Sequence, residues 1–339
     1  MDFIILIDWV ENYLLMRYNS INRHAYQLWK GKHQMAYKNF YDLISNINNS
    51  KIKKVVVVAA ADDEHVLEAV FKAQEDNLLD YILIGNKANI LEKGKALFHP
   101  IEEAKVVEAS NDQEAAYKAV EFIRNGKGDF LMKGKLETRT LLKEVVNKET
   151  GIGKGRIMSH MCIMEIPAYH KLIGFTDGGM IINPTLKEKV GIIENSLELF
   201  RNLGVESPKI AAVTAIETVN PKMIDTVDAA ELKKMSLEGR FGDCYIEGPI
   251  SCDLTFSKES AAIKGFESPV TGDADIMLVP NVATGNILTK ALIYLAGAKM
   301  AGCILGAKIP IVLPSRGSTF EEKYYSLVIC ATQLSLKGL

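Results

Sequence analysis

Cysteine is scarce in this chain: its 339 residues contain only five, and they are widely scattered. Seven residues lie between the closest pair, Cys244 and Cys252, whereas the paired cysteines of a zinc site lie about two to four residues apart. An odd, scattered set also gives no disulfide framework. We therefore expect no metal site and a location in a reducing compartment, the cytoplasm.

Long apolar runs and an excess of one charge are missing as well. The apolar residues 3–7 are followed by Asp8, although a membrane span needs about 18 or more consecutive apolar residues. The 40 Lys and Arg residues nearly balance 42 Asp and Glu residues, so the net charge is −2. A nucleic-acid-binding protein typically carries a basic surface. The sequence therefore predicts no membrane segment and no nucleic-acid partner.

What is present is the composition of a folded protein, with 48% hydrophobic and 24% charged residues. At roughly 150 residues per domain, the length predicts about two domains. Residues 1–34 differ from the rest, because they contain both tryptophans, Trp9 and Trp29, and show no regular alternation. We expect this segment to be an upstream extension, with natural synthesis beginning at Met35. The alternative interpretation is a short amphipathic docking helix.

From Met35 onward, short apolar runs alternate with helical patterns. The run at 54–60 is rich in β-branched residues, and the acidic residues 62–64 after it open an amphipathic helix. Further strands are predicted at 81–85, 104–109, 130–132, 157–166, 172–176, 210–213, 244–247, 276–279, 302–305 and 309–313. Further helices are predicted at 87–97, 112–125, from about 138, 186–203, 221–235, 285–299 and from about 319. This alternation predicts a doubly wound α/β fold.

The glycine-rich stretch 151–156 separates two sets of these units and is interpreted as a boundary. It is not a P-loop, because it ends Gly155-Arg156 where that motif requires Gly-Lys followed by Ser or Thr. A dinucleotide fingerprint would need a third glycine at Arg156. Both nucleotide-binding motifs therefore fail.

Four predicted strands end in polar residues. Ligands of open α/β sheets bind beyond the carboxyl ends of strands, where loop amides and helix N-termini converge. The four polar stretches are Lys133-Gly134-Lys135, Ser159-His160, Asp177-Gly178-Gly179 and Pro314-Ser315-Arg316-Gly317-Ser318-Thr319.

The last of these stretches suits an anion best. The Arg316 guanidinium can grip phosphate oxygens, neighbouring hydroxyls can donate hydrogen bonds, and the following helix N-terminus adds partial positive charge. Alternatively, Ser318 or Thr319 only caps the helix, with Glu321 or Glu322 in its first turn. Two other readings also stay open, since His160 fits a hydrogen-bonded structural histidine and Asp177 fits a simple turn.

Short stretches at these strand exits and elsewhere together resemble the phosphate acyltransferase family, which contains phosphate acetyltransferase and phosphate butyryltransferase. The resemblance runs from about Met35 to the C-terminus and is closest to the butyryltransferase branch. Each stretch is short, and their common order along the chain makes the resemblance specific. They are Met132-Lys133-Gly134 with Thr138, Met158-Ser159-His160, Asn220-Pro221-Lys222-Met223 with Asp228-Ala229-Ala230, Glu247-Gly248-Pro249, Ala274-Asp275-Ile276, Pro280-Asn281 with Thr284-Gly285-Asn286, and Ser315-Arg316.

The resemblance implies two doubly wound α/β domains with the site in the cleft between them, similar to the architecture of isopropylmalate dehydrogenase. Residues 35–158 and 302–339 would form the first domain, and residues 159–301 the second. It also implies the reversible reaction of acyl-CoA with phosphate to give acyl phosphate and free coenzyme A. Both small molecules are then substrates, and no covalently bound cofactor is needed.

The resemblance assigns roles to individual residues. Ser315 and Arg316 would be catalytic, and Glu322 or its neighbour Glu321 would take the proton of the coenzyme A thiol. The substrate-binding residues would be Lys133, Gly134, Thr138, Lys143, Ser159, His160, Asp177, Asn286, Ser318 and Thr319. The chain departs from the acetyltransferases in having Ser318 where they often have cysteine, Glu rather than Asp at the base, and Lys143 where an arginine is expected.

Other functions remain as alternatives to a butyryltransferase. They are phosphate acetyltransferase, a non-catalytic module that senses acyl-CoA, and a dehydrogenase on the same architecture, which the failed dinucleotide motif disfavours. We also expect a homodimer or larger homo-oligomer. The reason is that the helix at 287–295 and the terminal helix with Tyr324, Leu327 and Val328 carry more apolar surface than one sheet face should bury.

Overall fold

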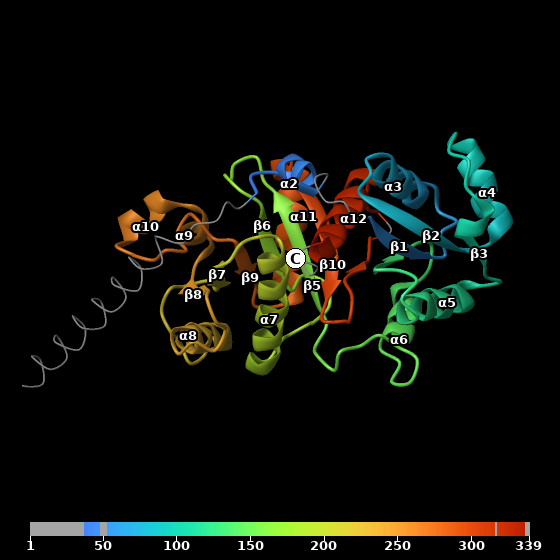
Figure 1. Cartoon of the computed structure of the whole chain (residues 1–339). Coiled ribbons are helices and arrows are strands. Elements are labelled where there is room, and N and C mark those ends of the chain that lie inside the picture. Colours follow the sequence, from blue (N-terminus) through green and yellow to red (C-terminus); the bar gives the residue numbers. More distant parts are fainter. Residues whose placement is uncertain (1–36, 48–52, 316, 336–339) are drawn as a thin grey trace, which may run out of the picture. The chain divides into compact units, whose positions relative to one another are not determined.

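The computed structural model describes residues 37–47, 53–315 and 317–335 (Figure 1). The predicted extension 1–34 and Arg316 therefore lie outside the described residues. The first elements are α2 (Phe40–Ile47), β1 (Lys54–Ala59), α3 (Glu64–Glu75), β2 (Leu79–Gly85), α4 (Lys87–Ala96), β3 (Val106–Glu108), α5 (Asp112–Arg124), β4 (Phe130–Lys133) and α6 (Thr138–Val145). Apart from α2, which was not predicted, they match the predicted alternation of strands and helices closely.

The second set of elements follows the glycine-rich boundary. It consists of β5 (Ser159–Glu165), β6 (Ile173–Thr176), α7 (Leu186–Asn202), β7 (Lys209–Val213), α8 (Ile224–Leu237), β8 (Tyr245–Ile250), α9 (Cys252–Phe256), α10 (Lys258–Lys264), β9 (Ile276–Leu278), α11 (Val282–Ala296), β10 (Lys299–Leu305), β11 (Ile311–Val312) and α12 (Phe320–Ser335). The short helices α9 and α10 were not predicted.

All these strands form one sheet in the order β3-β2-β1-β4-β11-β10-β5-β6-β9-β7-β8. The pairs within β1–β4 and β11 are parallel, whereas β10 is antiparallel to both β11 and β5. The predicted α/β class is confirmed. The sheet runs without interruption through both predicted domains, so the division at 158 and 302 stays a prediction.

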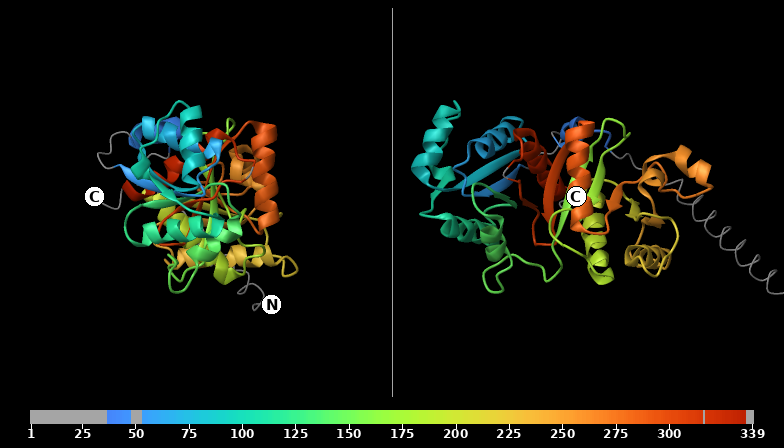
Figure 2. Two further views of the ribbon diagram at one scale, coloured as in Figure 1. Left: turned by 90° about the vertical axis from the view of Figure 1, so that its right-hand side faces the viewer. Right: turned by 180° about the vertical axis from the view of Figure 1, so that it is seen from behind.

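Helices cover both faces of the sheet (Figures 1 and 2). In β1, Val56 and Val58 pack in the hydrophobic cluster that contains side chains of α3, α7 and α12, while Val57 packs in the cluster under α5 and α6. A third cluster lies under α9, α10 and α11. This alternation explains why β1 is apolar throughout, since both of its faces are buried.

The helix expected at 285–299 begins and ends three residues earlier, and capping explains the difference. The Asn281 side chain accepts a hydrogen bond from the Thr284 N–H at 3.0 Å, so the helix begins at Val282. Gly297 ends it with a left-handed φ of 66°. The residues released from the helix begin β10 at Lys299.

Candidate active site

The strand order reverses between β1 and β4, because the chain moves outward from β1 to β3 and then returns to the other side of β1. Ligands of open α/β sheets bind at such a switch point. Here the Gly134 N–H donates to the Ala59 carbonyl at 2.8 Å, and an added Cβ at Gly134 would lie 2.0 Å from the Ala60 carbonyl oxygen. Only glycine permits this backbone contact, which holds the Lys133-Gly134 turn at the carboxyl end of β1.

Lys133 ends β4 and is almost fully buried. Its Nζ donates hydrogen bonds to the carbonyl oxygens of Gly134 at 3.2 Å and Leu136 at 3.1 Å. The lysine charge is thus held inside the turn that leads to α6.

Thr138 and Lys143 are both exposed on α6, but the helix does not bring them together. Five residues correspond to about 500° of helix rotation, so their side chains lie about 140° apart around the axis. Arg139, which was not among the predicted site residues, is exposed beside Thr138 in the first turn of α6. Arg139 lies closer than Lys143 to the Lys133-Gly134 turn along the chain. Its place directly after Glu137-Thr138 could have identified it as a candidate site residue from the sequence.

The Ser315–Thr319 stretch forms a tight turn before α12. The Ser318 N–H donates to the Ser315 carbonyl at 3.1 Å, and the Gly317 N–H donates to Ser315 Oγ at 3.2 Å. Ser315 and Thr319 are exposed, whereas Ser318 is nearly buried. Because β11 pairs with β4, this turn and the Lys133 turn follow neighbouring strands at the same sheet edge.

Thr319 and Glu322 form a capping box at the start of α12. The Thr319 N–H donates to Glu322 Oε2 at 3.3 Å, and the Glu322 N–H donates to Thr319 Oγ1 at 3.2 Å. The predicted helix cap is therefore confirmed for Thr319, with Glu322 as its partner, and this cap can coexist with an anion site at the turn. Glu321 is exposed beside it.

Asp177 follows β6 and is fully buried. Its Oδ2 accepts the His160 N–H at 2.9 Å, and its Oδ1 accepts the N–H groups of Gly179 at 2.8 Å and Met180 at 2.7 Å. Three backbone donors satisfy most of what a carboxylate can accept. The carboxylate thus shapes the 177–180 turn and ties it to β5.

Two further predicted residues belong to this part of the sheet. Ser159 is fully buried at the start of β5, and its Oγ lies 3.0 Å from Asn195 Nδ2. Asn286 is exposed on α11, with its Nδ2 3.5 Å from the Gly178 carbonyl oxygen. The structure therefore brings Asn286 to the 177–180 turn, while Ser159 packs against α7.

The His160 ring lies between two glycines, because an added Cβ at Gly179 would be 3.0 Å from its Cγ and one at Gly302 would be 3.1 Å from its Nε2. Its Nδ1 is buried without a hydrogen-bond partner among the described residues. Burial lowers the pKa of His160, and the Asp177 carboxylate opposes this only in part. Burial of the ring therefore favours its neutral form.

Strand register relates His160 to Lys133. His160 pairs with Ile304, Ile304 with Ile311, and Ile311 with Leu131. Paired residues share a sheet face, and Lys133 follows Leu131 on that face because side chains alternate along β4. His160 and Lys133 therefore face the same side of the sheet.

A hydrophobic cluster on this face connects the two groups of predicted residues. Leu136 and Leu313 come from the turns after β4 and β11, while Met158 precedes β5 and Met180 follows Asp177. Their packing in one cluster ties the lysine and serine turns to the histidine and aspartate segment.

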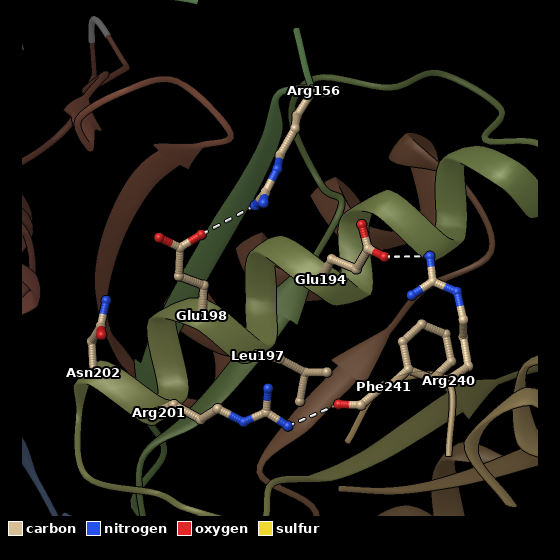
Figure 3. A pocket seen from close by; sticks show the side chains of 8 residues that line it. All are labelled: Arg156, Glu194, Leu197, Glu198, Arg201, Asn202, Arg240 and Phe241. Carbon is tan, nitrogen blue, oxygen red and sulfur yellow. Dashed lines mark hydrogen bonds and ion pairs between the residues drawn. The ribbon is translucent and has the colours of Figure 1, made fainter. Parts of the chain in front are cut away.

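A cavity lies elsewhere, beside α7 (Figure 3). It has a volume of about 420 Å³, and its charges pair with one another: Arg156 lies 3.4 Å from Glu198, and Arg240 lies 2.6 Å from Glu194. None of the predicted site residues that the structure describes lines it. This cavity is separate from the strand exits.

Metal-binding side chains and membrane-spanning helices can be assessed for the described part of the chain. It holds no group of three or more His, Cys, Asp or Glu side chains arranged to bind a metal ion. No helix within residues 37–47, 53–315 and 317–335 combines the length and apolar character that a membrane crossing requires.

Comparison with known proteins identifies the family to which this chain is similar. The model of the family described as phosphate acetyl/butaryl transferase matches residues 39–115 and 101–331. The chain is 39% identical over 294 residues to phosphate butyryltransferase of Clostridium acetobutylicum, covering 87% of this chain and 97% of that protein. It is 40% identical over 292 residues to phosphate acetyltransferase of Thermotoga maritima, covering 86% and 99%.

A solved structure agrees with these sequence matches. It is a branched-chain phosphotransacylase from Enterococcus faecalis V583, with 33% identity and a TM-score of 0.72. The similarity covers 83% of this chain and 98% of that one.

Proposed function

The chain belongs to the phosphate acetyl/butaryl transferase family, and from this membership we infer that it transfers a short acyl group reversibly between coenzyme A and inorganic phosphate. A phosphate oxygen would attack the thioester carbonyl carbon, the C–S bond would break, and acyl phosphate and coenzyme A would form. The observation that carries this proposal is the family match across 39–331, which includes every predicted site residue. Thiol release from acyl-CoA that depends on phosphate tests it.

The geometry supports a phosphate position near the Ser315 turn. This turn follows β11 and precedes the N-terminus of α12, where the helix dipole places partial positive charge that favours anions. We assign Arg316 to binding phosphate and stabilising the charge that develops on the tetrahedral transition state. Ser315 would donate a hydrogen bond to the same oxygens, and Lys133 would add positive charge from the neighbouring turn.

The proposed acyl group is butyryl, although relatives named for acetyl and butyryl transfer are similarly close. One or two methylene groups are worth only about 1–3 kcal/mol each in an apolar pocket. Comparing kcat/KM for acetyl-, propionyl-, butyryl- and valeryl-CoA decides the preference. A protein that binds these thioesters without turning them over would instead be an acyl-CoA-sensing module.

The general base can be separated from the helix cap, because glutamine also serves in a capping box. We expect Glu322→Gln to keep the cap and the melting temperature while kcat for acyl phosphate and coenzyme A falls at least about tenfold. The loss should be largest at low pH, where little of the coenzyme A thiol is ionised. Initial rates across pH, together with melting curves, check this.

Glu321→Gln is the matched control for this experiment, since Glu321 is exposed and takes no part in the capping box. Loss of activity in the Glu321 variant with full activity in Glu322→Gln would move the base to Glu321. An unchanged rate in both variants would contradict a carboxylate base on α12.

The proposed homo-oligomer depends on α11 alone. The terminal helix α12 does not contribute, because Leu327 and Val328 are completely buried within this chain. On α11, by contrast, Ile287, Tyr294 and Leu295 are 69%, 79% and 86% exposed. An exposed apolar helix face of this kind is typical of a subunit interface.

We therefore expect light scattering to give a mass of at least two chains, and Leu295→Arg to reduce it to one. Because Leu295 is so exposed, this change should leave the fold of the single chain intact. The matched control is Ile263→Arg, which changes an equally exposed residue on α10 and should preserve the oligomer. A single-chain mass for the unmodified protein would contradict the proposal.

The proposal places the enzyme in the cytoplasm. All five cysteines are free thiols, and burial raises the pKa of Cys162, Cys244 and Cys330. Free thiols throughout are typical of proteins from reducing compartments.

A further inference from the structure

Lys323 is a buried lysine in the first turn of α12 that the mechanism above does not use. Only 5% of it is exposed, although lysine is rarely buried without an ionic partner. Its Nζ donates to the Ser318 carbonyl oxygen at 2.5 Å, and no described carboxylate lies within ion-pair distance. Within the described part of the chain, the ammonium group of this buried lysine contacts only a turn carbonyl, and this calls for an explanation.

Acidic groups surround Lys323 at longer range. They are Asp63 at the N-cap of the neighbouring helix α3, Glu68 on α3 and Glu322 on its own helix, and their attraction opposes the lowering of the Lys323 pKa by burial. Each already has a closer partner: Asp63 accepts the Val66 N–H, Glu68 contacts His65, and Glu322 accepts the Thr319 N–H. Among the described residues, these acidic groups therefore attract the ammonium group only at longer range, and none forms an ion pair with it.

The Ser318 carbonyl is a critical point of that turn. The Ser318 N–H already closes the turn onto the Ser315 carbonyl, so Lys323 fixes the other side of the same residue. Together with the capping box at Thr319, this bond ties Ser318 and Thr319 to the start of α12.

We propose that Lys323 is a positioning residue of the phosphate site, which fixes the Ser315–Ser318 turn through the Ser318 carbonyl and adds one positive charge behind it. This inference rests on the proposed function, because it takes that turn as the phosphate site. A displacement of about 1 Å in a binding group can lower a rate by about 10²-fold. The charge further favours an anion over water at the turn.

The test uses Lys323→Met, which keeps the length of the side chain but removes the charge and the hydrogen bond. We expect KM for phosphate to rise at least about tenfold while KM for acyl-CoA changes less than about twofold. Lys323→Arg keeps the charge and a donor and should recover part of the phosphate affinity. Calorimetric titration of the full chain with inorganic phosphate should show the same order of affinities without depending on turnover.

Tyr324→Phe is the matched control, because it removes the hydrogen bond of the next α12 residue to Asp76, 2.6 Å long, at the end of α3. It should lower the melting temperature without changing either KM. If Lys323→Met lowers only the melting temperature, as Tyr324→Phe does, Lys323 merely packs α12 and the inference is wrong.

Failure of the proposed function looks different. If the unmodified protein shows no phosphate-dependent turnover, the proposed function is wrong. The titration with phosphate would still test whether Lys323 contributes to phosphate binding. Equal phosphate affinity in the unmodified protein and Lys323→Met, or binding in neither, overturns the positioning role.

Discussion

Replacing Arg316 by lysine is expected to lower kcat/KM by roughly 10²-fold or more, about 2.7 kcal/mol, while the melting temperature barely changes. Lysine keeps the positive charge but loses the two parallel N–H groups that match two phosphate oxygens. The effect should be larger than that of Ser315→Ala, which removes one neutral donor. Initial rates at subsaturating phosphate measure both variants.

The two possible roles of Arg316 give different outcomes. If Arg316 is only structural, stability must fall together with activity in Arg316→Lys. Full activity of Arg316→Lys at subsaturating phosphate would show that the 314–319 turn is not the catalytic anion site.

Gly134→Ala is expected to have the second large effect. The new Cβ would lie 2.0 Å from the Ala60 carbonyl oxygen and 2.8 Å from that of Ala59, and these are backbone atoms of β1 and its exit that cannot rotate away. Forcing a methyl group against a rigid backbone should cost about 2–4 kcal/mol of unfolding free energy. Because the Lys133 turn must shift, kcat/KM should fall as well.

Urea unfolding and initial rates together check the Gly134 prediction. Gly153→Ala is the matched control, since the new Cβ would lie 4.0 Å from the Val145 carbonyl oxygen, which is an ordinary van der Waals contact. We expect this control to keep both stability and activity. A Gly134→Ala protein as stable as the Gly153→Ala protein would show that β1 and β4 separate easily at their carboxyl ends.

Much of the fold could be predicted because its strands are short, apolar and separated by helices. The run at β1 is buried on both faces, so every residue from Val56 to Ala59 carries the signal. Helices α9 and α10 were missed because they have five and seven residues, too few for a helical period to show. The helix expected from 221 begins at Ile224, after a turn in which the Met223 N–H donates to the Asn220 carbonyl.

The candidate site was only partly accessible from the sequence. The stretch Pro314–Thr319 is local, so both its anion-binding and its capping interpretations could be stated in advance. Asp177 was different, because one of its three backbone donors comes from His160, 17 residues away on another strand. Only the pairing of β5 with β6 shows that this carboxylate is engaged by the backbone.

Lys323 and His160 were hidden for a related reason. A lysine in the first turn of a helix resembles an ordinary surface residue, and its burial depends on the packing of α12 against α3. The close packing of the His160 ring depends on Gly179 and Gly302, which lie on different segments of the chain. The sequence shows which residue types follow each strand. Whether such a side chain is exposed or already hydrogen-bonded depends on residues from distant segments of the chain.

The most direct test of the proposed reaction is to measure free thiol and acyl phosphate in the same reaction of the full chain with butyryl-CoA and inorganic phosphate. Thiol is read with a thiol reagent, and acyl phosphate is trapped by hydroxylamine in parallel samples. The proposed function predicts one acyl phosphate for each thiol released, with both absent when phosphate is omitted. Thiol release without phosphate, or no release from any acetyl-, propionyl-, butyryl- or valeryl-CoA, would contradict it.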